Sequence, residues 1–315
     1  MLATVTRSGV TESVHDGAIA VVDPSGRLVA SHGDIDRRYF ARSTIKPFQA
    51  TVVIEHGAEL PPEWLALACS SHTGAPIHIS TIRAMLRSAG LSETHLLTPP
   101  SWPDREANRD RLLRTRHQGP ESVFNNCSGK HVGFLMACVA SGWDLASYRE
   151  PTHPLQERVQ ALLGDMTGLS RFDVGVDGCG APTYTVSARS LATAFARLGN
   201  DERFSRVFDA MHRFPRLSSG MGKPDAEFAI HTNGVSKRGA EGNLGLSIRD
   251  RGAVAIKVFD GDSRAIGPVV TDVLTQLGWV TPAIAGALAA VTRVPMSGGG
   301  REVGTVESVV RLDLK

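Results

Sequence analysis

Residues 17–57 read GAIAVVDPSGRLVASHGDIDRRYFARSTIKPFQATVVIEHG, and the fold class follows from this stretch. Two β-rich runs, 17–23 and 27–31, are joined by Pro24-Ser25-Gly26, which is typical of a hairpin turn. The pattern then becomes helical. Because proline is tolerated only in the first turn of a helix, Pro47 places the helix start close to Ser43. The chain therefore begins with a strand pair that leads into a helix.

Helical patterns dominate the middle of the chain, and strands return near its end. We expect helices at about residues 62–69, 76–88, 104–115, 130–141, 154–167, 187–198, 202–212 and 266–278, and a short buried helix in 282–291. We expect strands at about residues 243–249, 253–259 and 304–313. This order predicts an α+β fold: an antiparallel sheet built from both chain ends and covered by helices, with a helical lobe.

The composition excludes several classes of protein. The net charge is +2 and acids interleave with bases even in 105–116, so we expect no nucleic-acid partner. The first residues lack a signal-peptide pattern, and no apolar run reaches the ~18 residues of a membrane span. We therefore expect a cytoplasmic protein without a membrane partner. In that setting, four cysteines indicate reduced thiols or metal ligands rather than disulfides.

Lysine is scarce, since only six of the 34 basic residues are lysine. Arginine stays protonated, whereas lysine can lose its proton and act as a base or a ligand. A retained lysine can therefore mark a special site. Base composition and chance explain the scarcity equally well, so the position of each lysine within a motif must decide.

Arg42-Ser43-Thr44-Ile45-Lys46 is the only Ser-x-x-Lys segment in the chain. Positions i and i+3 of a helix share a face, so the amine of Lys46 can reach the hydroxyl of Ser43. A lysine of lowered pKa can activate a serine nucleophile, and the free N–H groups at a helix start can hold an oxyanion. The alternative is that Ser43 caps the helix and Lys46 is a surface charge.

The segment ACSSHTG, residues 68–74, ends an apolar helix with small residues that allow close backbone approach. Ser71 is a candidate for a second hydroxyl in the site, which would shuttle protons. His72 is more typical of a loop or core histidine than of a catalytic base.

Two cysteines stand next to glycines: Cys127 in NNCSGKH (125–131) and Cys179 in VDGCGAP (176–182), where we expect an exposed turn. Cys138 lies in the apolar run FLMACVA and reads as core, and we expect the same of Cys69. Two thiolates can bind zinc, and a neutral Lys130 is a candidate third ligand that leaves one position open. The upstream glycine of a P-loop is missing before Lys130, so we exclude nucleotide binding.

Two further lysines lie near the late strands. Ser236-Lys237-Arg238-Gly239 resembles the Lys-Thr-Gly strand of β-lactamases, with Arg238 in place of the hydroxyl residue. Lys257 interrupts an apolar run. Either a core-facing amine or an outward lysine on an edge strand fits this position.

Taken together, RSTIKPFQA, SSHTG, NNCSGKH, DGCGAPTY and KRGAEG resemble the asparaginase II family of Rhizobium etli-type L-asparaginases, over nearly the whole chain. The resemblance implies a fold shared with serine β-lactamases and penicillin-binding proteins. It also implies hydrolysis of L-asparagine to L-aspartate and ammonia, and a homodimer. We therefore expect one catalytic domain over residues 1–315, of one or two lobes.

The resemblance also implies a set of site residues. Catalysis would fall to two Ser–Lys pairs, Ser43 with Lys46 and Ser71 with Lys257, and the order in which the serines attack stays open. Zinc would be held by Cys127, Lys130 and Cys179. Supporting roles are expected for Arg42, His72, Asp177 and Lys237.

Two positions depart from the family pattern. Ala75 stands where many relatives carry Glu, and Lys223 stands where Arg is usual; either change could alter substrate choice. Two rival functions stay open at this point. One is another serine amidase or a β-lactam-recognising hydrolase on the same fold, and the other is a non-catalytic protein that binds an amino acid or zinc.

Overall fold

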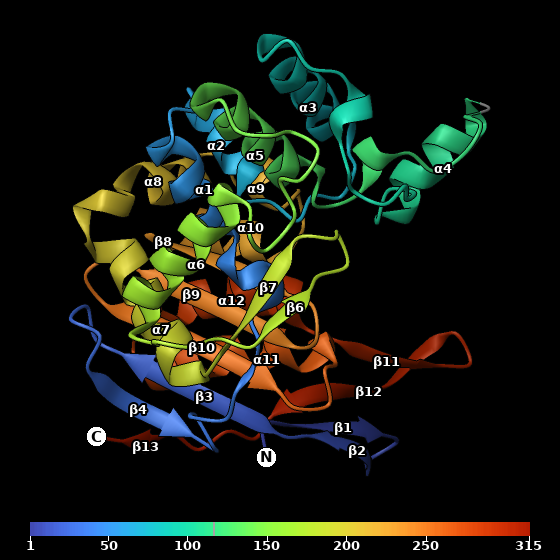
Figure 1. The fold of residues 1–315 in the computed structure, drawn as a ribbon. Coiled ribbons are helices and arrows are strands. Elements are labelled where there is room, and N and C mark those ends of the chain that lie inside the picture. The colour runs from blue at the N-terminus through green and yellow to red at the C-terminus, as the bar shows by residue number, and fades with distance from the viewer. Residues whose placement is uncertain (116) are drawn as a thin grey trace. The chain divides into compact units, whose positions relative to one another are not determined.

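A computed structural model describes residues 1–115 and 117–315 of the chain. The chain divides into two compact units. Unit 1 comprises Met1–Thr44, Thr185–Ser205 and Gly222–Lys315, and unit 2 comprises Ile45–Tyr184 and Arg206–Met221. Both chain ends therefore belong to unit 1 (Figure 1).

Unit 1 is built around a six-stranded antiparallel sheet with the strand order β13-β4-β3-β10-β9-β8 (Figure 1). Its strands are β3 (Gly17–Val22), β4 (Leu28–His32), β8 (Gly234–Gly239), β9 (Asn243–Ile248), β10 (Gly252–Val258) and β13 (Asp313–Leu314). At its centre β3 pairs with β10, which comes from the other end of the chain. The predicted antiparallel sheet built from both chain ends is confirmed, and so is the hairpin within 17–31.

The two faces of this sheet carry different side chains because successive residues of a strand point in opposite directions. Ile19 and Val21 of β3 and Ile256 of β10 belong to the main hydrophobic core of unit 1. The alternate residues on these strands, such as Ala18 and Ala255, are small. The pattern of buried strands with one large-residue face and one small-residue face lets two layers of helices pack on the sheet.

Helix α7 (Ala188–Asn200) covers the small-residue face and packs on β3, β9 and β10. Gly245 of β9 allows this close approach, since a Cβ at that position would clash with the ring of Phe195 on the helix. Lys257 lies on the same face as Gly245, near the end of β10.

A second sheet in unit 1 has four strands in the order β11-β12-β1-β2. They are β1 (Ala3–Arg7), β2 (Val10–His15), β11 (Pro295–Gly298) and β12 (Arg301–Ser308). The strand expected at 304–313 is therefore shifted, and it splits into β12 and the short β13. The remaining helices of the unit are α10 (Pro224–His231), α11 (Ile266–Gln276) and α12 (Pro282–Thr292). The expectation that α12 is buried is wrong, since its buried residues are Leu288 and Thr292 alone.

Unit 2 consists mainly of helices, which confirms the predicted helical lobe. Its helices are α1 (Lys46–Glu55), α2 (Pro62–Ala68), α3 (Pro76–Ser88), α4 (Glu106–Arg114), α5 (Ser128–Ser141), α6 (Pro154–Thr167), α8 (Ser205–Arg213, from its second residue) and α9 (Pro215–Ser218). The centre is α5, whose residues from Ser128 to Cys138 are all buried and which contacts α1, α2, α3 and α6. In this unit the strand β6 (Val174–Val176) pairs with the first residues of β7 (Pro182–Val186).

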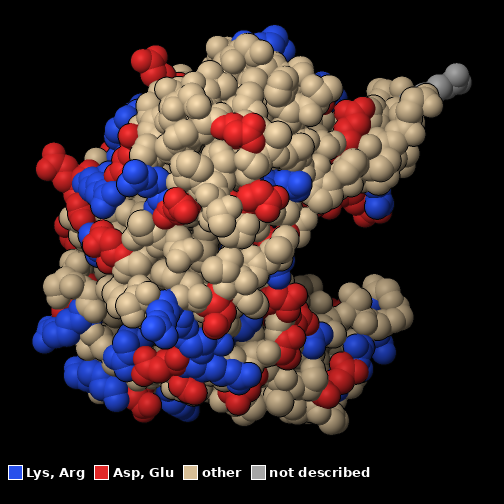
Figure 2. Space-filling model, in the orientation of Figure 1, with Lys and Arg blue, Asp and Glu red and all other residues tan. Residues whose placement is uncertain are grey.

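Helix α4 buries no residue, so the predicted solvated helix face is confirmed for the described part of 105–116; Arg116 lies outside the described residues. Acidic and basic side chains lie interspersed on the face shown in Figure 2. None of the described helices combines the length and the apolar character that crossing a membrane requires.

Candidate active site

Lys46 is the first residue of α1, and its side chain is buried, with 1% of its surface exposed. The amine donates to the carbonyl oxygen of Ser70 at 2.6 Å, to Ser71 Oγ at 2.9 Å and to Cys127 Sγ at 3.2 Å. The alternative that Lys46 is a surface charge is therefore excluded. Unit 2 brings together this lysine, the second candidate serine and one candidate zinc ligand.

His72 holds the loop that carries Ser71. Its Nδ1 accepts from the backbone N–H of Gly74 at 3.1 Å, so Nε2 carries the proton and donates to Ser128 Oγ at 2.8 Å. Its own backbone N–H donates to the carbonyl oxygen of Asn126 at 3.0 Å. Burial, with smaller effects from His78 and Lys46, lowers the pKa of His72 well below the usual value, so the ring is neutral. His72 thus fixes the serine loop against the segment before Cys127.

Cys127, Lys130 and Cys179 also come together in unit 2. The amine of Lys130 donates to Cys179 Sγ at 3.1 Å, and the thiol of Cys127, which interacts with Cys179, donates to Asn126 Oδ1 at 3.2 Å. Cys127 is 5% exposed and Cys179 is 2% exposed, so both thiols are buried although the turn around Cys179 was expected to be exposed. The tight turn is present, but it places Gly178 outside and the thiol inside. Cys69 and Cys138 are buried, and their prediction as core residues is confirmed.

The protonation of these three groups follows from their contacts. The hydrogen bond from Cys127 lowers the pKa of Cys179 to about 4, aided by the charge of Lys130 and opposed by burial. The same bond, together with burial, raises the pKa of Cys127 to about 12. Burial alone would lower the pKa of Lys130, but the charges of Cys179, Cys127 and Asp177 outweigh burial and raise it. Of the two thiols, Cys179 is therefore the more acidic.

This donor set has the chemistry of a zinc site. Thiolates prefer zinc to magnesium or calcium. Within residues 1–115 and 117–315, no three side chains of His, Cys, Asp or Glu form a metal-binding group. A third ligand would therefore come from Lys130, which already contacts Cys179. Asp177 accepts from the backbone N–H of Gly178 at 2.8 Å, and its charge acts on Lys130, as a supporting acid would.

Ser43 lies in unit 1, in the 3-10 turn Arg42–Ile45 that leads directly into α1. The N-cap of α1 is Ile45, so Ser43 does not cap that helix. Arg42 has a positive φ of 53°, which is uncommon for a residue with a side chain. Such backbone strain is found most often at functional sites.

Lys257 lies on β10, a central strand, and only 8% of its surface is exposed. An outward lysine on an edge strand is therefore excluded. Its amine donates to the carbonyl oxygen of Glu241. Burial lowers the pKa of Lys257, and the charges of Arg37 and Arg42 act in the same direction, while the charges of Glu241 and Asp260 oppose them.

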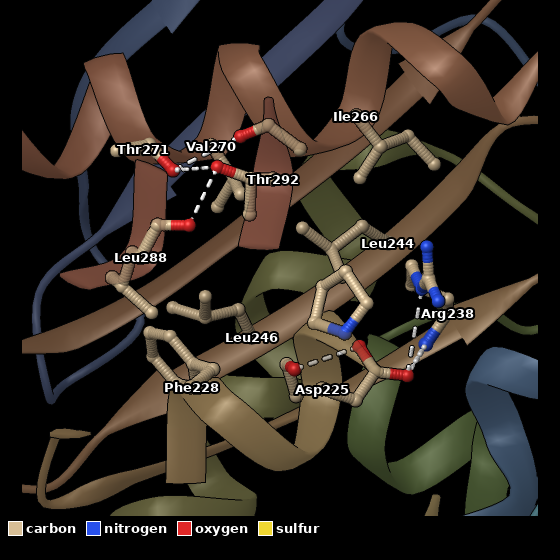
Figure 3. Close-up of a pocket in the computed structure, with 13 residues that line it drawn as sticks. Asp225, Phe228, Arg238, Leu244, Leu246, Ile266, Val270, Thr271, Leu288 and Thr292 are labelled. Carbon is tan, nitrogen blue, oxygen red and sulfur yellow. Dashed lines mark hydrogen bonds and ion pairs between the residues drawn. The ribbon is translucent and has the colours of Figure 1, made fainter. Parts of the chain in front are cut away.

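Lys237 is also buried, on β8, and its amine donates to the carbonyl oxygen of Arg238 at 2.8 Å. Arg238 pairs with Asp225 at 3.7 Å, and that carboxylate also accepts from Ser236 Oγ at 2.8 Å. Figure 3 shows Asp225 and Arg238 at the edge of a largely apolar pocket between α10, α11, α12 and the sheet. Its volume of about 20 Å³ holds roughly one water molecule, so it is too small for an amino acid.

Comparison with known families settles the class of the protein. The model of the family L-asparaginase II matches residues 3–308. The chain belongs to the L-asparaginase II family. It is therefore an asparaginase, an amidohydrolase of L-asparagine, as the motifs predicted. No curated protein sequence matches this asparaginase. The Rhizobium etli type stays a prediction.

Two solved proteins share part of the backbone arrangement of this asparaginase. A β-lactamase from Mycobacterium bovis is 20% identical, with a TM-score of 0.44, over 88% of this chain and 94% of its own. A protein named Mglu, in its native form, is 15% identical, with a TM-score of 0.37, over 84% of this chain and 64% of its own. The α+β class rests on the strands and helices described above, and the β-lactamase-like fold stays a prediction.

The structure adds residues to the asparaginase that the sequence did not indicate. Tyr39 and Asn243 lie beside Lys257. His131, the residue after Lys130, forms a hydrogen bond between its ring Nδ1 and the hydroxyl of Tyr148 at 2.7 Å. Asn243 could have been found by folding the late hairpin about residues 250–251, which places it opposite Lys257. Nothing in the spacing of the sequence points to Tyr39.

Proposed function

We propose that the protein hydrolyses L-asparagine through a covalent acyl-enzyme, with Ser43 as the nucleophile and Lys46 as its base. One observation carries the proposal: Lys46 is a buried amine at 2.9 Å from the hydroxyl of Ser71, and it follows Ser43 by three positions at a helix start. A buried lysine that contacts a hydroxyl in a loop of small residues is suited to moving a proton.

In the first half of the reaction, Lys46 as free amine takes the proton of Ser43 while Oγ attacks the side-chain amide carbon of asparagine. Backbone N–H groups near the helix start stabilise the oxyanion. The C–N bond then breaks, and the proton that Lys46 took from Ser43 is relayed through Ser71 and Lys257 to the leaving nitrogen, which departs as ammonia. In the second half, water cleaves the β-aspartyl ester to L-aspartate, and Ser43 regains its proton.

Cys127, Lys130 and Cys179 are proposed to hold a zinc ion. Bound zinc would supply a positive charge and an open coordination position that orient the substrate. The proposal is supported by the convergence of two sulfurs and one amine in unit 2. Ser43 already serves as nucleophile, so no step of the mechanism passes through the metal.

A homodimer and a cytoplasmic location complete the proposal. Static light scattering of the purified protein tests the first, since a single species of twice the chain mass of 33.6 kDa is expected. Cell fractionation tests the second.

The proposal is tested by assaying the purified protein on L-asparagine, L-glutamine and a chromogenic β-lactam. We expect ammonia release from asparagine and a β-aspartyl ester that can be trapped by rapid acid quench and detected by intact mass. Hydrolysis of the β-lactam without turnover of asparagine would identify the rival hydrolase. Binding of asparagine without turnover would identify a non-catalytic protein.

A further inference from the structure

Two residues beside Lys257 each carry a polar atom that lacks a hydrogen-bond partner among the described residues: the hydroxyl of Tyr39 and the side-chain oxygen of Asn243. Both atoms are buried. Buried polar groups are nearly always hydrogen-bonded, because a buried group without a partner destabilises the fold. Two such atoms around one lysine point to a ligand that supplies their partners.

The orientation of Asn243 is fixed by its other bonds. Its Nδ2 donates to the carbonyl oxygen of Phe40 at 3.0 Å and to that of Ala240 at 2.8 Å. Turning the amide over would lose both bonds, so Oδ1 is the atom left as a free acceptor. Asn243 is paired directly with Lys257 between β9 and β10, and the two side chains therefore share one face of the sheet.

Tyr39 approaches the same lysine from β5 (Tyr39–Phe40), which pairs in unit 1 with the end of β7. The amine of Lys257 lies 5.4 Å from the centre of the tyrosine ring. Burial raises the pKa of Tyr39, so its hydroxyl keeps its proton. Lys257 has 8% of its surface exposed, and Tyr39 is half-buried.

We propose that Tyr39 and Asn243 bind the substrate beside Lys257, their side-chain oxygens accepting hydrogen bonds from a nitrogen of asparagine. This inference rests on the proposed function. The two oxygens present lone pairs, so together they suit a group rich in N–H donors. Asparagine has two such groups, the α-ammonium and the side-chain amide that leaves as ammonia.

The test is Tyr39→Phe, which removes the hydroxyl and keeps the ring. We expect kcat/KM for L-asparagine to fall about tenfold, as for the loss of one hydrogen bond. The Tm should equal or exceed that of the wild type, because an unpartnered buried hydroxyl is gone. The matched control is Ser247→Ala: Ser247 Oγ is also buried and unpartnered among the described residues, and it lies further along β9, so kcat/KM should not change.

Inhibition by L-aspartate separates the two nitrogen sources, because aspartate keeps the α-ammonium and lacks the amide. If the α-ammonium is bound, Tyr39→Phe weakens Ki as much as KM; if the amide is bound, Ki is unchanged and kcat falls. A kcat/KM within about twofold of the wild type overturns the inference. If the wild-type protein releases no ammonia from L-asparagine, the proposed function itself is wrong, and the inference is overturned with it. This outcome is recognised without any variant.

Discussion

The amine of Lys46 contacts three parts of the candidate site at once. It meets a backbone carbonyl, the Ser71 hydroxyl and the Cys127 sulfur, so a single buried group links the serine loop to the cysteine cluster. Arginine could not replace it, because a guanidinium is larger and does not lose its proton. The Ser-x-x-Lys motif singled out this position in the sequence, although its contacts depend on packing between α1, α2 and α5.

Lys257 should set a pH dependence. Burial lowers its pKa below the usual value, so the free amine becomes available at a lower pH than for an exposed lysine. If the free amine carries protons in the reaction, kcat/KM should rise as pH rises through this lowered pKa. Lys257→Arg should lose most activity, and raising the pH should not restore it.

The control for this prediction is Lys315→Arg, at an exposed position, which should keep the wild-type pH profile. The same shift has a stability consequence with a definite sign. Between the lowered pKa and the ordinary one of about 10.4, the unfolded chain binds more protons at this lysine than the folded chain does. The contribution of Lys257 to the free energy of unfolding therefore increases as pH rises through this range. A Lys257→Arg enzyme that stays fully active would show that the amine acts only as a charge.

Individual residues were predictable where a motif named them and unpredictable where tertiary pairing creates their role. The motif lysines at 46, 130, 237 and 257 were singled out from the sequence, and all are buried. Tyr39 and Asn243 had no motif. Asn243 lies opposite Lys257 through the β9–β10 register, which the hairpin turn at 250–251 implies, whereas Tyr39 reaches the lysine through the two-residue strand β5, which sequence spacing does not encode.

At the scale of elements, the turn at residues 177–180 decides where the Cys179 thiol points. Gly180 has φ of +85°, and a Cβ there would clash with Arg149 Nη1, which donates to the carbonyl oxygen of Leu97 at 2.6 Å. Gly178, on the other side of the cysteine, has open space around it and no positive φ. The backbone conformation and the neighbouring arginine therefore require glycine at position 180, whereas neither requires it at position 178.

Gly180→Ala should therefore lower the free energy of unfolding by about 1–3 kcal/mol and reduce metal content, because the strained turn moves the thiol. Gly178→Ala is the matched control, expected to stay within about 0.5 kcal/mol of the wild type. Denaturant unfolding and elemental analysis of both variants are the measurements. Equal effects of the two substitutions would contradict this account of the turn.

Elements with a strong local pattern were predicted, and those that depend on distant partners were not. The first hairpin, α3 and α6 match their predicted ranges because apolar periodicity and turn residues mark them in the sequence. The strands β1 and β2 carry polar, alternating residues and form through pairing of β1 with β12 from the other chain end. Such strands have no apolar run of their own, and local reading misses them.

At the scale of the whole molecule, the zinc proposal predicts that metal loss changes activity but not folding. Unit 1 has a large hydrophobic core of its own, and α5 provides a buried centre for unit 2, so neither depends on one metal ion. Exhaustive chelation should leave the far-ultraviolet circular dichroism unchanged. Cys127→Ser should raise KM more than it lowers kcat, if zinc orients the substrate.

Elemental analysis of protein purified without chelator measures the metal directly, and Cys138→Ala, a core cysteine on α5, is the control that should keep its zinc. Protein that contains no zinc and stays fully active after chelation would show that the cysteine cluster is structural.

Ser43 as the nucleophile of an L-asparagine amidohydrolase is tested by steady-state ammonia release from L-asparagine by the wild type and by Ser43→Ala. We expect measurable turnover by the wild type and a loss on the order of 10³-fold or more in the variant, with its circular dichroism unchanged. A folded Ser43→Ala protein that releases ammonia at close to the wild-type rate would contradict this assignment.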